Sequence, residues 1–62
     1  MPTKPEKDVL IVEDDAAIRR LLSHALSRQG LVCDEAPDGI PGLAKLEAAN
    51  YAVVLLDFMM PA

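Results

Sequence analysis

Three apolar runs alternate along this chain with two segments of helical periodicity. The runs Val9–Val12 and Ala52–Leu56 are apolar at every position. Continuous runs of this length are typical of strands buried on both faces of a parallel sheet. The third run, Leu31–Ala36, is more polar, which predicts an outer strand.

The segments between these runs predict two helices. Apolar residues recur at i, i+3, i+4, i+7 and i+8 from Ile18, which predicts a helix over about residues 16–29 that ends at Gly30. Turn residues at 37–39 precede a second helix, expected over about residues 40–49. Within it, Pro41 suits a first helical turn, whereas Gly42 weakens the helix start. The order strand–helix–strand–helix–strand predicts an α/β fold with right-handed crossovers and a parallel sheet.

Composition limits the size of the domain and its partners. The chain has 62 residues, of which 52% are hydrophobic, so we expect one small folded domain after a loose tail at residues 1–7. A net charge of −4 argues against direct nucleic-acid binding. There is no apolar run long enough for a membrane span and no secretory leader. Together with a single cysteine, this favours a cytoplasmic protein.

Both continuous apolar runs end in carboxylates. Glu13, Asp14 and Asp15 follow the first run, and Asp57 follows the last. Parallel α/β sheets bind ligands at the carboxyl ends of their strands, so these acids would share one pocket. A hard cation such as Mg²⁺ relieves repulsion between carboxylates, and a carboxylate beside a metal can act as a nucleophile toward a phosphoryl group. The competing interpretation is that the acids cap a helix, through Asp14 or Asp15, and solvate loops.

Three separated motifs in this order resemble the receiver domain of two-component response regulators. The resemblance covers nearly all of residues 8–62. The motifs that carry it are Val9–Asp15 with Ile18, Arg19 and Leu22, then Ala36–Gly39, then Tyr51–Pro61. The family implies a flavodoxin-like, doubly wound parallel sheet. This chain would supply its first three strands and two helices, with strand order 2-1-3, so that residues 8–62 form a receiver domain truncated after the third strand.

The resemblance also implies roles for individual residues. Asp57 would be the phosphoacceptor and a Mg²⁺ ligand, joined by Asp14 and by the backbone carbonyl of Met59. Glu13 would act on the metal through a water molecule. Asp15 falls just outside this set and is kept as a further candidate.

The family implies a signalling role in which a histidine kinase transfers a phosphoryl group to Asp57 with Mg²⁺. A complete receiver domain catalyses its own phosphorylation and dephosphorylation. These 62 residues contain no counterpart of the family's hydroxyl residue after strand four or its lysine after strand five, so we expect impaired or absent activity and no enzyme function. The alternative is a self-associating half-domain, a homodimer or higher oligomer, which pairs through an exposed edge at residues 52–56. An aspartate-nucleophile phosphatase ranks last, because Met59 stands where that class usually has a second acid.

Overall fold

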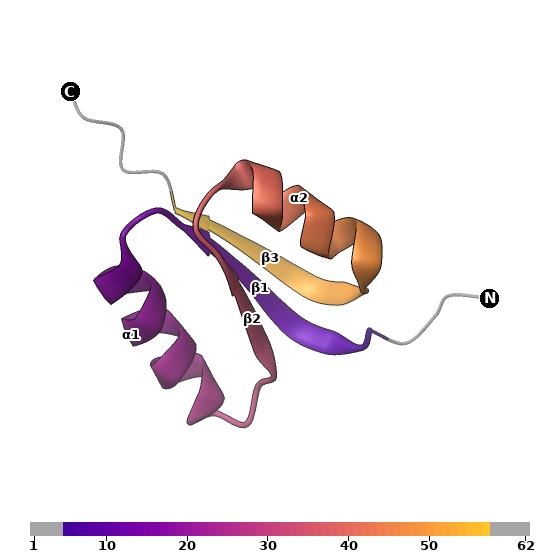
Figure 1. The fold of residues 1–62 in the computed structure, drawn as a ribbon. Coiled ribbons are helices and arrows are strands. Elements are labelled where there is room, and N and C mark those ends of the chain that lie inside the picture. Colours follow the sequence, from indigo (N-terminus) through magenta and orange to yellow (C-terminus); the bar gives the residue numbers. More distant parts are fainter. Residues whose placement is uncertain (1–4, 58–62) are drawn as a thin grey trace.

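A computed structural model of the chain describes residues 5–57. Its elements, in order, are β1 (Lys7–Glu13), α1 (Ala16–Ser27), β2 (Cys33–Ala36), α2 (Gly39–Ala48) and β3 (Tyr51–Asp57). The strands form one sheet in the order β2-β1-β3, and both pairs are parallel. The predicted α/β fold and strand order 2-1-3 are therefore confirmed. Figure 1 shows α1 and α2 on opposite sides of this sheet.

The core is built on β1. This strand is paired on both edges, and residues 9–13 are all buried. Leu10 and Ile11 are completely buried, and Leu10 clusters with Val12 and Ala36. Because helices cover both faces of the central strand, side chains on both faces of Val9–Val12 are buried and apolar. This explains the unbroken apolar run in the sequence.

Several element boundaries differ from the sequence-based prediction. β1 begins at Lys7, inside the expected tail, because Lys7 N–H donates to the carbonyl of Asn50 at 3.1 Å and Lys7 pairs with Tyr51. β2 begins only at Cys33, and α1 ends at Ser27. Backbone pairing does not require an apolar side chain, so strand ends leave little trace in a hydropathy pattern.

Gly30 lies just beyond α1, which ends at Ser27 and not at residue 29 as predicted, and it is where the chain turns toward β2. Its φ is +85°, a conformation that favours glycine. Its N–H donates to the carbonyl of Ser27 at 2.9 Å, and the N–H of Leu31 donates to that of Leu26 at 3.3 Å. These two bonds satisfy carbonyl groups at the end of the helix, as in a Schellman motif.

Gly42 has a packing role that the sequence did not indicate. It is buried, and a Cβ atom on it would lie 3.0 Å from Cγ2 of Val12. A glycine at this position therefore allows α2 to approach β1 closely. The lower helix propensity of Gly42 is offset by this contact.

A polar cluster ties the three strands together near their amino ends. Lys7 Nζ of β1 donates to Oδ1 of Asp34 in β2 at 3.1 Å, and the hydroxyl of Tyr51 in β3 donates to Oδ2 of Asp34 at 2.5 Å. The hydrogen bond from Tyr51, and then the bond and charge of Lys7, lower the pKa of Asp34 against the opposing effect of burial. The same bond is the largest cause that raises the pKa of Tyr51 to about 12.

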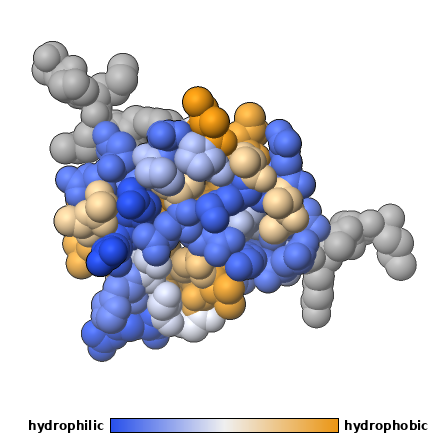
Figure 2. All heavy atoms as spheres, in the orientation of Figure 1, coloured by the Kyte–Doolittle hydropathy of each residue, from blue (hydrophilic) through white to orange (hydrophobic). Residues whose placement is uncertain are grey.

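β3 is the less covered side of the sheet. In the part of the chain that the structure describes, it pairs with β1 alone. Its apolar residues are all exposed: Val53 by 56%, Val54 by 36%, Leu55 by 36% and Leu56 by 56%. Figure 2 shows apolar patches that interrupt a largely hydrophilic surface. Neither of the two helices described could cross a membrane.

Candidate phosphoacceptor site at the carboxyl ends of the strands

The sheet register places the two acidic strand ends side by side. Glu13, the last residue of β1, is the register partner of Asp57, the last residue of β3. Neighbouring strands lie about 4.8 Å apart, and parallel strands point to the same edge of the sheet (Figure 1). The backbone therefore brings Glu13 and Asp57 to the same edge of the sheet.

Glu13 is held by contacts of both its side chain and its backbone. Its side chain is buried, with 1% of the residue exposed. Oε1 accepts a hydrogen bond from the backbone N–H of Asp15 at 3.1 Å. Its carbonyl oxygen accepts one from Nη1 of Arg19 at 2.7 Å. The end of β1 is therefore fixed before the chain turns into α1.

The two aspartates that follow differ in their contacts. Oδ1 of Asp15 accepts hydrogen bonds from the backbone N–H groups of Ala17 at 2.8 Å and Ile18 at 3.1 Å, so Asp15 is the N-cap of α1. The sequence left the cap open between Asp14 and Asp15, and the structure assigns it to Asp15. Asp14 is exposed, and no hydrogen bond or ion pair of its side chain occurs among residues 5–56. Its carboxylate is available to a ligand.

Arg19, which the sequence named only as part of a family motif, is a cation beside these acids. Its guanidinium bonds the Glu13 carbonyl, and its Nε lies 3.5 Å from Oε1 of Glu35 in β2. No sequence signal marks the first contact, because its acceptor is a backbone carbonyl that any residue type would provide. The polar cluster at the opposite end of the strands also went unpredicted, since it joins residues far apart in sequence.

The donor chemistry at this edge fits a hard divalent cation. Glu13, Asp14 and Asp57 offer only oxygen ligands, which Mg²⁺ prefers. Among the side chains that the structure describes, no three His, Cys, Asp or Glu residues gather in an arrangement that could hold a metal ion. The predicted carbonyl ligand, Met59, lies outside the described residues. The metal ligands therefore stay predictions.

Comparison with known proteins gives one consistent result. Residues 9–62 match the family model of the response regulator receiver domain. The chain is 48% identical over 56 residues to the transcriptional regulatory protein ResD of Bacillus subtilis, which covers 90% of this chain and 23% of ResD. It is 43% identical over 53 residues to the transcriptional regulatory protein CseB of Streptomyces coelicolor, which covers 86% of this chain and 23% of CseB.

A third relative is the probable transcriptional regulatory protein SilR of Salmonella typhimurium, with 42% identity over 53 residues, 86% of this chain and 23% of SilR. The chain thus spans less than a quarter of the length of these curated relatives. No solved structure matched.

Proposed function

Because this chain belongs to the response regulator receiver domain family, we propose that its Asp57 accepts a phosphoryl group from a histidine kinase. The observation that supports this proposal best is the register between Glu13 and Asp57. It brings a strand-terminal aspartate beside the acidic end of the central strand. Receiver domains are signalling modules. The chain spans only part of its longer relatives, so a regulatory output or a kinase partner is proposed for it and not shown.

The transfer itself requires a nucleophile and charge neutralisation. A carboxylate oxygen of Asp57 forms a bond to phosphorus, the phosphorus–nitrogen bond of a phosphohistidine breaks, and the departing imidazole takes up a proton. Asp14 and Asp57, with the backbone carbonyl of Met59 and with Glu13 through water, would hold Mg²⁺. When bound, Mg²⁺ neutralises charge on the phosphoryl group and the carboxylates. Asp15 contributes to the turn as a helix cap.

A polypeptide of these 62 residues should perform the transfer poorly or not at all. It contains no counterpart of the hydroxyl residue and the lysine that hold the phosphoryl oxygens in this family. Preorganised donors of this kind commonly change rates by two to three orders of magnitude. We therefore propose that the polypeptide by itself is not an enzyme and needs those groups to be supplied.

A transplant into a longer relative tests the role of Asp57 separately from this impairment. The segment of this chain that aligns with 56 residues of ResD replaces the matching part of that protein. The hybrid is then incubated with acetyl phosphate and Mg²⁺ and measured by intact mass. We expect a gain of one phosphoryl group that is lost in Asp57→Asn and retained in Asp38→Asn, a matched change of a helix-capping aspartate.

The 62-residue chain itself is measured under the same conditions, and we expect little or no gain. A stable gain that Asp57→Asn abolishes would refute the proposed impairment. A hybrid that keeps its phosphoryl group in Asp57→Asn would refute Asp57 as the acceptor.

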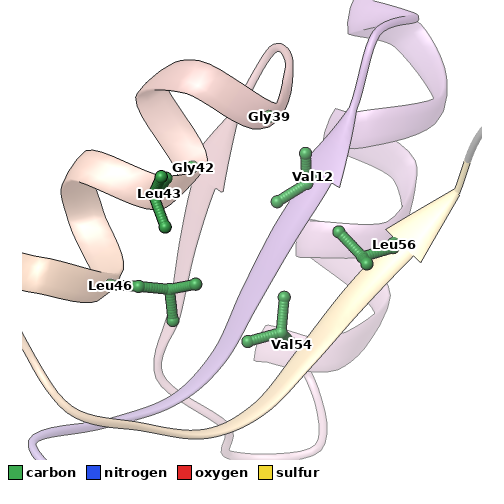
Figure 3. Close-up of a pocket in the computed structure, with 7 residues that line it drawn as sticks. All are labelled: Val12, Gly39, Gly42, Leu43, Leu46, Val54 and Leu56. Atoms are coloured by element: carbon green, nitrogen blue, oxygen red, sulfur yellow. The ribbon is translucent and has the colours of Figure 1, made fainter.

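The exposed edge of β3 favours a second candidate function, self-association of the 62-residue chain. Beside this strand lies an apolar groove of about 400 Å³. Figure 3 shows its lining from α2, β1 and β3: Val12, Gly39, Gly42, Leu43, Leu46, Val54 and Leu56. An unpaired strand edge with uncovered apolar faces is a template for pairing with another chain. Antiparallel pairing of two copies would keep their Asp57 residues apart, whereas parallel pairing would oppose like charges.

Light scattering after size-exclusion chromatography tests this candidate. We expect a mass that rises with concentration toward a dimer or higher oligomer. Val54→Lys, in the groove, should shift the chain to monomer. Leu21→Lys, at a residue of α1 that is 68% exposed, should not. A monomer at all concentrations would rule out self-association.

A further inference from the structure

Arg19 ties the helix α1 to the end of β1 and to β2. It is the fourth residue of α1, and its backbone N–H donates to the carbonyl of Asp15 at 2.9 Å. From there its side chain, 18% exposed, reaches back to the carbonyl of Glu13 at 2.7 Å and to the carboxylate of Glu35 at 3.5 Å. One guanidinium thus joins three elements at the edge where the acids gather.

The carbonyl that Arg19 binds belongs to the same peptide unit as the N–H of Asp14. Because a peptide unit is planar, a fixed direction of the Glu13 carbonyl also fixes the direction in which the Asp14 backbone leaves β1. The next residue is restrained as well, since Asp15 N–H donates to Oε1 of Glu13 and its side chain caps α1. Asp14 is therefore held from both sides through its backbone, while its own carboxylate makes no hydrogen bond or ion pair among residues 5–56.

We propose that Arg19 is a positioning residue that orients Asp14 for cation binding beside Asp57. This inference rests on the proposed phosphoacceptor function. Arg19 acts through the Glu13 carbonyl and touches neither the cation nor the phosphoryl group. The carboxylate of Glu35 partly neutralises the charge of Arg19. The guanidinium therefore repels a cation at the acidic edge only weakly.

Positioning and charge predict opposite effects when Arg19 is replaced. If Arg19 acted only as a positive charge, its removal would tighten Mg²⁺ binding by about twofold, the size of a Coulomb effect that water and salt screen over about one Debye length. If it positions Asp14, removal weakens binding by about tenfold, as is common when a group that orients a ligand is lost. The sign of the change therefore distinguishes the two roles.

The chain provides a matched control. Arg20 is the next residue of α1, carries the same charge and is exposed. It makes no hydrogen bond or ion pair among the described residues. Arg20→Met removes the same charge and length of side chain without touching the Glu13 carbonyl.

The experiment is a Mg²⁺ titration of the isotope-labelled 62-residue chain, followed by amide resonances, with urea unfolding of each variant. We expect Arg19→Met to weaken Mg²⁺ binding about tenfold and Arg20→Met to leave it within about twofold. Arg19→Lys keeps the charge but loses the planar fork. It should weaken binding by an intermediate factor, and it serves if Arg19→Met does not fold. Unchanged or tighter binding in a folded Arg19 variant overturns the proposal.

Spectra without metal separate this inference from the proposed function. In them, the amide resonances of Asp14 and Asp15 should move in Arg19→Met and stay in place in Arg20→Met. If the unaltered chain shows no response to Mg²⁺, the cation site itself is refuted. The metal-free spectra then decide whether Arg19 orients Asp14, and unmoved resonances reject that role.

Discussion

The adjacent residues Asp14 and Asp15 provide the sharpest test of the site. They have the same side chain and lie one residue apart between β1 and α1, so replacing either one removes the same charge. The structure nevertheless gives them different contacts. Asp15 caps α1 through two backbone N–H groups at 2.8 and 3.1 Å, whereas Asp14 is exposed and is the proposed metal ligand. Asp14→Ala and Asp15→Ala should therefore change different properties.

The stability change expected for Asp15→Ala follows from the lost cap. Removal of an N-cap side chain costs about 1 kcal/mol, within roughly 0.5–2. Loss of a negative charge at the start of a helix adds roughly 0.3–1 kcal/mol at low salt. For a domain of this size, each kcal/mol lowers the melting temperature by roughly 4–8 °C. Asp14→Ala removes no hydrogen bond or ion pair among the described residues, so its free energy of unfolding should stay within about 0.5 kcal/mol of the unaltered chain.

Two assays measured on the same samples separate these effects. Urea unfolding, followed by circular dichroism, gives the free energy of unfolding, and a Mg²⁺ titration gives the affinity. Asp15→Ala should lose stability and only a small part of its affinity, because its N–H bond to Glu13 remains, while Asp14→Ala should lose most of its affinity and keep its stability. Asp15→Asn is a useful control, because asparagine caps helices about as well as aspartate, so most of the stability should remain.

An exchange of these effects between Asp14 and Asp15 would contradict the roles assigned to them. A loss of Mg²⁺ affinity in Asp15→Ala with normal affinity in Asp14→Ala would make Asp15 the ligand. A large loss of stability in Asp14→Ala would show that Asp14, and not Asp15, secures the turn.

Two further predictions concern packing and pH. Gly42→Val should destabilise the chain by about 1–3 kcal/mol, because Cγ2 of Val12 lies 3.0 Å from the added Cβ. Gly39→Ala is the control, since nothing lies within 4 Å of its added Cβ, and it should be neutral or slightly stabilising. Urea unfolding measures both variants, and equal effects would refute the close approach of α2 to β1. Tyr51→Phe should flatten the dependence of stability on pH at both ends. The folded-state pKa of Asp34 is lowered, so its contribution is present above its unfolded pKa of about 3.9 and is lost as pH falls. The pKa of Tyr51 is raised to about 12, so its contribution is complete below about pH 10 and is lost as pH rises toward 12. Urea midpoints across these two ranges check this prediction, and an unchanged profile in Tyr51→Phe would contradict it.

The sequence by itself determined the order of the elements and the location of the acidic edge. Unbroken apolar runs indicated buried parallel strands, and the 3.6-residue spacing from Ile18 indicated α1. Gly30 indicated where the chain turns, as its φ of +85° confirms. These features depend on local backbone conformation and on burial. Both are recorded in the sequence, as turn residues and as the spacing of apolar residues. The two acidic strand ends could be placed together because strand order and direction follow from this alternation.

Only the tertiary structure decided which partner each polar group has. The cap belongs to Asp15, because the path of the chain out of β1 brings its carboxylate, and not that of Asp14, to the first N–H groups of α1. Gly42 lies against Val12 because the sheet register and the position of α2 bring them together.

The same holds for contacts between distant residues. Lys7 meets Asp34 across 27 positions, and Tyr51 meets Asp34 across 17. Arg19 binds a backbone carbonyl, and every residue type has one, so the sequence does not reveal this partner. Hydropathy records how deeply a residue is buried, whereas the choice of a hydrogen-bond partner depends on distances that exist only after the strands have paired.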